Sequence, residues 1–287
     1  MRRATDSQPS LSGGVAWLAH FALFVASVSC LSGQVLAAAR CDKPVYLTID
    51  TGHMGVAPLV AEVLARHQVQ ATFFLANERT QAVGGRPEGS SLDAHWAGWW
   101  RQLAAQGHDF GSHTWDHVVW QADHPTGLRV RPTAGPHNGE RLTLSDADYC
   151  EQLQRPATRF EQMTGQRMRA IFRAPGGRTS PRLLALAQRC GWQHVPWTPN
   201  GFLGDELDSA RYPNAALLSQ ALQRVRSGEI LLMHLGIWRR QDPWAPAVLE
   251  PLIVGLKARG FCFETLKQHP VFGAAGPAPR DGHVPSR

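Results

Sequence analysis

Short apolar runs alternate with amphipathic stretches along most of the chain. The β-rich runs predict strands at 45–50, 71–75, 107–112, 170–172, 193–197, 230–234 and 261–264. Helical spacing of apolar residues predicts helices at 56–67, 92–105, 145–163, 181–191 and 214–225. The run at 71–75 is uninterrupted, which is typical of a parallel strand buried on both faces. The alternation predicts an α/β fold, a distorted parallel (β/α) barrel of about seven strands in a single domain.

Two segments do not follow this alternation. Residues 118–144 form a long connection rich in Pro, Gly, His and Arg without a repeated period, which is typical of a functional or disordered loop. We expect Arg129, Arg131, His137 and Arg141 to make it a polar rim. The Gly/Pro-rich residues 270–287 are expected to be a disordered tail.

The first 39 residues have the pattern of an export signal. Arg2 and Arg3 precede an apolar run at 15–28, and small residues follow at 35–39. The alternative is an uncleaved anchor, because the stretch is long enough to span a membrane. We therefore expect residues 40–269 to be the folded domain of an exported protein, periplasmic or secreted.

Cysteine content and charge agree with export. Removal of residues 1–39 leaves Cys41, Cys150, Cys190 and Cys262, an even number suited to an oxidising compartment. We favour Cys41–Cys262, which would join the ends of the barrel, and Cys150–Cys190, which would join two helices; four free thiols are the alternative. The net charge of +6 is spread without a Lys/Arg run, so a nucleic-acid partner is not expected.

The segment His113-Thr114-Trp115-Asp116-His117 carries the first candidate chemistry. Two histidines four residues apart would share one face of a helical turn, so both imidazoles could reach one ion. Imidazole is a common ligand of zinc and similar divalent ions. Two ordinary surface histidines are the alternative.

Charged and polar side chains also follow the predicted strands. The residues at or just after a strand end are Asp50, His113, Arg173 and His234. In a parallel barrel these ends share one face, where active sites lie. Packing alone does not explain four such side chains around one rim, so we expect an active site.

The order of these motifs resembles the polysaccharide deacetylase family (NodB homology, carbohydrate esterase family 4). The matching segments are 48–52 (TIDTG), 113–117 (HTWDH), 173–176 (RAPG) and 232–234 (LMH), and the resemblance covers roughly residues 44–266. The resemblance implies a hydrolase that removes N-acetyl or N-formyl groups from amino sugars of an envelope or extracellular glycan. The expected partner is therefore an amino-sugar glycan, and a membrane would be contacted only through the N-terminal segment.

The resemblance also implies roles for individual residues. His113 and His117 would bind a divalent metal ion, zinc or alternatively cobalt or nickel. Asp50 would act as general base, positioned by Arg173, and His234 would act as general acid.

The substrate would lie beside the segment Pro175-Gly176. The N–H of Gly176, after Pro175, would help to bind the oxyanion. Among many tryptophans, we expect Trp197 and Trp238 to line the glycan site and most others to be core.

Three positions depart from the family pattern. Thr51 stands where the family usually has a metal-binding aspartate, so Asp50, His53 or water would have to complete the ligand set. Gly176 replaces a usual tyrosine. The aspartate that tunes the acidic histidine has no clear match, since Asn200 lies nearest and Asp205 is a weaker substitute.

The departure at Thr51 keeps other functions open. One alternative is a catalytically inactive carbohydrate-binding relative that has lost the metal site. Another is a metal-dependent hydrolase of a small C–N substrate.

Overall fold

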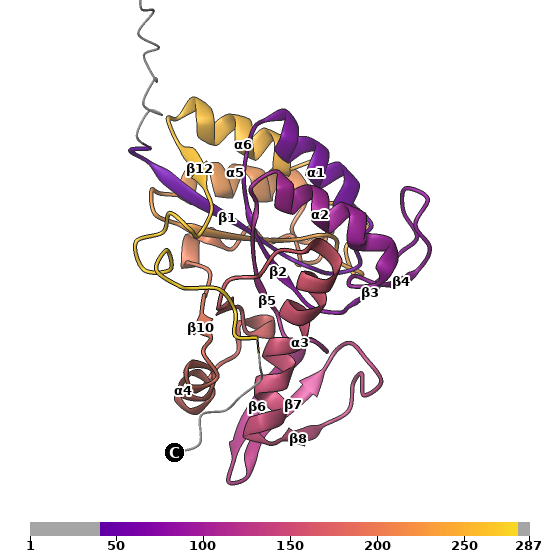
Figure 1. The fold of residues 1–287 in the computed structure, drawn as a ribbon. Coiled ribbons are helices and arrows are strands. Elements are labelled where there is room, and N and C mark those ends of the chain that lie inside the picture. The colour runs from indigo at the N-terminus through magenta and orange to yellow at the C-terminus, as the bar shows by residue number, and fades with distance from the viewer. Residues whose placement is uncertain (1–40, 281–287) are drawn as a thin grey trace, which may run out of the picture. The chain divides into compact units, whose positions relative to one another are not determined.

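The computed structural model describes residues 41–280, in which strands alternate with helices (Figure 1). The strands are β1 Pro44–Asp50, β2 Thr72–Leu75, β3 Arg79–Thr80, β4 Gly89–Ser90, β5 Asp109–Ser112, β6 Val118–His124, β7 Gly127–Pro132, β8 Leu142–Leu144, β9 Ile171–Phe172, β10 Gln193–His194, β11 Ile230–His234 and β12 Cys262–Glu264. The helices are α1 Ala57–Arg66, α2 Ala97–Ala105, α3 Asp146–Thr164, α4 Pro181–Arg189, α5 Asn214–Arg224 and α6 Leu249–Ala258. The predicted signal or anchor lies outside the described residues.

A seven-stranded parallel sheet forms the centre of the molecule, in the order β10-β9-β5-β2-β1-β11, with β12 pairing to the start of β1. All four residues of β2 and six of the seven in β1 are buried. Such burial requires cover on both faces. Residues of all six helices share one core cluster with Leu47 and Phe73, whereas Tyr46 and Phe74, which point to the other face, belong to a second apolar cluster.

The sheet curls into a half-barrel that no regular strand pair closes. The chain after β10 instead makes isolated contacts with β11. The Thr198 N–H donates to the Ile230 carbonyl at 3.2 Å, and Phe202 forms a single parallel bridge with Leu232. The predicted fold class, a distorted parallel barrel, is therefore confirmed.

The segment 118–144 differs from the prediction, because it forms a three-stranded antiparallel sheet, β6-β7-β8. In β7, Leu128 and Val130 are buried while Arg129 and Arg131 are exposed. This alternation of period two is the pattern of a half-buried strand. The expectation of an irregular loop was wrong because the Pro, Gly and Arg content hid this short alternation.

Both favoured disulfides are present. Cys41 bonds to Cys262, with 6.0 Å between the Cα atoms, because β12 pairs with β1 next to Cys41. Cys150 of α3 bonds to Cys190, the residue after α4, with 5.7 Å between the Cα atoms. The first bridge fixes β12 at the start of β1, and the second joins helix α3 to the end of helix α4.

The start of the expected disordered tail is ordered in the structure. Phe272 is buried in an apolar cluster with Tyr46 and Ile171. The Ala170 N–H donates to the Gly276 carbonyl at 2.7 Å, and this bond holds the chain around Gly276 beside the start of β9. Apolar burial therefore orders the chain as far as Arg280, and residues 281–287 lie outside the described part.

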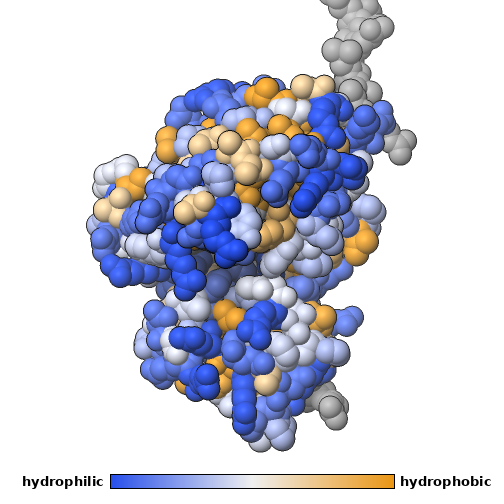
Figure 2. Space-filling model, turned by 180° about the vertical axis from the view of Figure 1, so that it is seen from behind, coloured by the Kyte–Doolittle hydropathy of each residue, from blue (hydrophilic) through white to orange (hydrophobic). Residues whose placement is uncertain are grey.

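The described surface is mostly hydrophilic on the face in Figure 2, where hydrophobic atoms form small scattered groups. From residue 41 to residue 280, no helix has both the length and the apolar composition needed to cross a membrane.

Candidate active site

The strand ends bring the predicted polar residues together. Asp50 ends β1 and His234 ends β11, and the two are direct partners in the parallel register. His113 follows β5, which lies two strands from β1. A cavity of about 250 Å³ opens at this rim, and its lining includes Asp50, Glu78, His113, His117, Gly176, Trp197, Glu206, His234 and Trp238.

Asp50 is held by a buried guanidinium. Arg173 Nη1 donates to Asp50 Oδ1 at 2.7 Å, and Nη2 donates to Thr48 Oγ1 at 2.7 Å. Burial favours the neutral carboxyl, but the charge of Arg173 outweighs it and the pKa of Asp50 is lowered. Asp50 is therefore a carboxylate at neutral pH, with Oδ2 directed toward His113.

His113 presents a lone pair to that carboxylate. Its Nδ1 lies 2.9 Å from the Arg173 carbonyl oxygen, which can only accept, so Nδ1 carries the proton. Burial lowers the pKa of His113 to about 4, so the ring is neutral at pH 7. Its Nε2 lies 3.4 Å from Asp50 Oδ2. A lone pair and a carboxylate oxygen repel each other unless a cation or proton lies with them, so the arrangement suits a bound cation.

His117 is oriented in the same way, although the predicted helical turn is absent. Residues 113–117 form a loop in which Thr114 and His117 have φ of 62° and 48°. The His117 Nδ1 lies 2.5 Å from Thr133 Oγ1, which leaves Nε2 for another partner. The ring centroids of His113 and His117 are 4.8 Å apart. The loop, rather than a helix face, brings the two imidazoles together.

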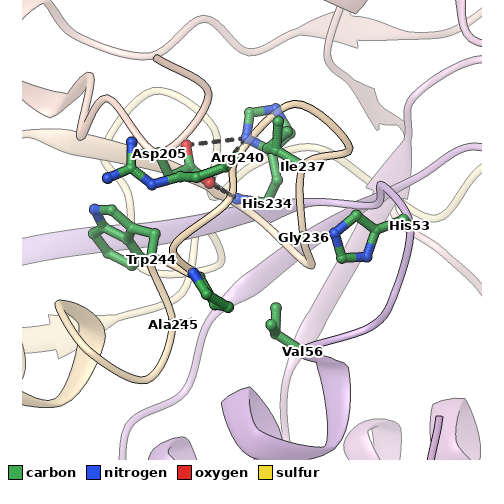
Figure 3. A pocket seen from close by; sticks show the side chains of 10 residues that line it. His53, Val56, Asp205, His234, Gly236, Ile237, Arg240, Trp244 and Ala245 are labelled. Atoms are coloured by element: carbon green, nitrogen blue, oxygen red, sulfur yellow. Dashed lines mark hydrogen bonds and ion pairs between the residues drawn. The ribbon is translucent and has the colours of Figure 1, made fainter. Parts of the chain in front are cut away.

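His234 forms a second pair of opposite charges. Asp205 Oδ2 accepts from the His234 main-chain N–H at 2.6 Å, and both carboxylate oxygens lie 3.1 Å from Nδ1 (Figure 3). Burial disfavours the charged ring, but the Asp205 carboxylate outweighs it and raises the pKa of His234 to about 9. Asp205, the weaker of the two residues considered from the sequence, therefore contacts His234, whereas Asn200 bonds to Glu229.

Neither Thr51 nor His53 presents a free ligand atom to this cavity. The Thr51 hydroxyl donates to Glu78 Oε2 at 2.5 Å and accepts from the Ala76 N–H at 3.1 Å. His53 Nδ1 accepts from the Gly55 N–H at 2.9 Å, and its ring lines a small neighbouring cavity of about 40 Å³ (Figure 3).

The remaining wall of the cavity is formed by a glycine and by tryptophan side chains. Gly176 adopts a left-handed φ of 63°, and a Cβ added there would make only ordinary contacts, with Arg178 and Val119 at 3.9 Å. Pro175 is buried beside it. Trp197 and Trp238 are the tryptophans in the cavity lining, and Trp238 is 53% exposed. The others named from the described chain are buried or packed against the core: Trp96, Trp99, Trp100, Trp115, Trp120, Trp192 and Trp244.

The donor set fits a divalent ion in part. Both imidazoles have Nδ1 engaged by an oxygen and Nε2 free to ligate, an arrangement usual for metal-binding histidines. Within residues 41–280, however, no three His, Cys, Asp or Glu side chains already converge as a ligand set. The described residues thus provide two oriented imidazole ligands, but no third protein ligand already lies beside them.

Comparison with known proteins identifies the family and the fold. The sequence model of the family described as polysaccharide deacetylase matches residues 37–195. The chain is 27% identical over 246 residues to a chitooligosaccharide deacetylase of Azorhizobium caulinodans, covering 82% of this chain and 98% of that one. It is 23% identical to a peptidoglycan-N-acetylglucosamine deacetylase of Bacillus cereus, covering 79% and 88%. A family 4 acetyl xylan esterase from Clostridium thermocellum, solved with a cobalt ion, has the same fold, with a TM-score of 0.59, 20% identity and coverage of 84% and 95%.

Fold and comparisons together define a hydrolase of the class that acts on carbon–nitrogen bonds of linear amides. The chain belongs to the polysaccharide deacetylase family. Sequence reasoning found the strand-end residues but missed Glu78 and gave Asp205 little weight, because both contacts span nearly thirty residues and carry no motif.

Proposed function

We propose that this protein is an exported, metal-dependent deacetylase that removes N-acetyl or N-formyl groups from amino sugars of an envelope or extracellular glycan. One observation carries the proposal. A carboxylate paired with Arg173 and an imidazolium paired with Asp205 end adjacent strands beside two imidazoles with free Nε2 atoms. This combination provides a base, an acid and two metal ligands in one cavity.

The two paired residues divide the proton transfers between them. Asp50 Oδ2, ionised at neutral pH, accepts a proton from the attacking water. His234, whose pKa is about 9, is protonated at neutral pH and donates a proton to the leaving amine. A divalent ion on His113 and His117, when bound, supplies a more acidic water and polarises the amide carbonyl.

The cavity wall orients the acyl group and the sugar. Gly176 lines the cavity after Pro175, and its N–H would donate to the carbonyl oxygen as negative charge develops there. The aromatic faces of Trp197 and Trp238 suit stacking on sugar rings. Arg173 acts through Asp50 as a positioning residue, since it is buried behind the carboxylate.

The substrate class and the location are supported by separate observations. The similar proteins are named for chitooligosaccharides and for peptidoglycan N-acetylglucosamine, both polymers of amino sugars. Two disulfides suit an oxidising compartment outside the cytosol. Members of the family are generally metal-dependent, and zinc fits the imidazole ligands, with cobalt or nickel as alternatives.

The test is amine release from N-acetylglucosamine oligomers, peptidoglycan and an N-formyl amino sugar after incubation with zinc, cobalt or nickel. Asp50→Asn and His234→Gln should each abolish release, and Asp208→Asn, which changes an exposed aspartate on the Asp205 loop, should not. Mass spectrometry of the products identifies the group removed. Equal, background release by the wild type and Asp50→Asn on every substrate and metal would overturn the proposal.

The second candidate is a catalytically inactive carbohydrate-binding relative, and Thr51 is the observation that favours it. A neutral hydroxyl stands in place of the expected aspartate, and the described residues contain no ready set of three ligands. Thr51→Asp separates the two candidates. Activity that appears only in this variant indicates a degenerate relative, whereas harm to existing activity indicates a site with its own working geometry.

A further inference from the structure

The cavity contains a carboxylate that the proposed mechanism does not use. Glu78 lies in the loop after β2 and lines the same cavity as Asp50, His113 and His117. Nothing in the sequence singles it out, because it is distant from every family motif. It nevertheless lines the same cavity as the two imidazoles that are proposed to bind the ion.

Glu78 is held in place at both its main chain and its side chain. Its N–H donates to Ser91 Oγ at 3.1 Å, and its carbonyl accepts from the Ser91 N–H at 2.9 Å. Glu78 Oε2 accepts from the Thr51 hydroxyl at 2.5 Å. Oε1 makes no hydrogen bond within the described residues, so one oxygen of the carboxylate is free to ligate.

The charges around the cavity leave Glu78 uncompensated. Asp50 is paired with Arg173, and Asp205 is paired with His234. Glu78 makes no ion pair with any residue between 41 and 280. A half-buried carboxylate that lines the same cavity as two imidazoles is stabilised by a cation.

We propose that Glu78 supplies the carboxylate ligand that position 51 lacks, so that His113, His117 and Glu78 hold the divalent ion. This inference rests on the metal dependence proposed above. Thr51 then has a different task from the usual aspartate, because its hydroxyl orients the replacement carboxylate. Since the three side chains do not already converge, Glu78 rotates about its side-chain bonds so that Oε1 reaches the ion, while Oε2 keeps its bond to the Thr51 hydroxyl.

Metal affinity of the full chain tests this without reference to activity. Zinc and cobalt binding are measured by calorimetry and by competition with a chelating dye, and the visible spectrum of bound cobalt reports its ligands. Glu78→Gln keeps the shape and can still accept from Thr51, and we expect it to weaken binding at least about 10-fold, the lower bound for partners outside the ligand shell. Thr51→Ala keeps the carboxylate and removes only the hydroxyl that orients it, so it should weaken binding less than Glu78→Gln.

Glu206→Gln is the matched control, because Glu206 is a second glutamate in the same cavity lining but follows Asp205 on another loop. It should weaken binding less than Glu78→Gln, because it removes a nearby charge and not a ligand atom, and an equal loss in both variants would contradict the assignment; thermal unfolding checks that each variant is folded. If the wild type binds an ion and Glu78→Gln binds it equally well with an unchanged cobalt spectrum, the assignment of Glu78 is wrong while the proposed function stands. If the wild type binds no ion, the proposed metal dependence fails first and this inference fails with it.

Discussion

The pairing of Asp205 with His234 makes a quantitative prediction about one proton. The pKa of His234 lies at about 9 instead of 6.5 because the Asp205 carboxylate overcomes the cost of burial. That difference corresponds to about 3 kcal/mol in favour of the charged ring. Asp205→Asn removes the charge while keeping the shape, and burial, which opposes the charged ring, remains. We therefore expect the pKa of His234 to fall toward or below 6.5, although Asp50 and Glu206 still raise it.

The stability of the variant should depend on pH in one direction. The pKa of His234 is higher in the folded protein than in the unfolded chain, so protonation of this ring stabilises the fold. The full stabilisation is present below about pH 6.5 and is lost as the pH rises through about 9. The free energy of unfolding of Asp205→Asn should thus be lower than that of the wild type by about 3 kcal/mol at pH 6, with a smaller difference at pH 9.

Two measurements check this prediction in the presence of a chelator. Imidazole NMR with ¹⁵N-labelled histidine gives the pKa of His234, and urea unfolding at pH 6 and pH 9 gives the stability difference. Asp208→Asn is the control, because that exposed aspartate accepts from the Arg211 N–H at 3.0 Å and does not contact His234. An unchanged pKa of His234, or an equal loss of stability at both pH values, would refute the reasoning.

Three further predictions concern other parts of the molecule. Arg173→Gln leaves Asp50 buried without its partner, so urea unfolding should show a loss of about 3–5 kcal/mol, and a loss below 1 kcal/mol would contradict the buried pair. Replacing both Cys150 and Cys190 with serine opens a link across 40 residues and should lower stability by about 4 kcal/mol by chain entropy; equal melting curves would argue against the bridge. Trp238→Ala, at a side chain 53% exposed, should raise KM for oligosaccharides with little change in kcat or melting temperature, and an unchanged KM would remove Trp238 from the sugar site.

The parts of the fold that the sequence predicts are those with a strong local signal. The runs that end in Asp50 and His234 are apolar because the sheet buries both their faces, so the strands and their final residues could be located without a structure. The disulfide partners followed from the order of the strands and helices. Helix α3 could be placed from Ser145, whose hydroxyl accepts from the Asp148 N–H and caps the helix.

The parts that could not be predicted depend on unusual backbone or on distant contacts. The loop of His113 and His117 uses positive φ at Thr114 and His117, which no spacing rule contains, so two histidines four apart were read as a helix face. The contacts of Asp205 with His234 and of Glu78 with Thr51 exist only after the strands have assembled. Helix α6, for which the sequence analysis made no prediction, is apolar enough that it lacks a clear polar face.

The two charge pairs also limit which residue can complete a metal site. Asp50 is engaged by Arg173, and Asp205 is engaged by His234, so moving either carboxylate onto an ion would leave a buried cation without its partner, at a cost of several kcal/mol. Glu78 can move without such a cost, because its bond to the neutral Thr51 hydroxyl involves no opposite charge. Threonine at position 51, where the family usually has aspartate, is therefore compatible with a working site when the carboxylate comes from Glu78, in the loop after β2.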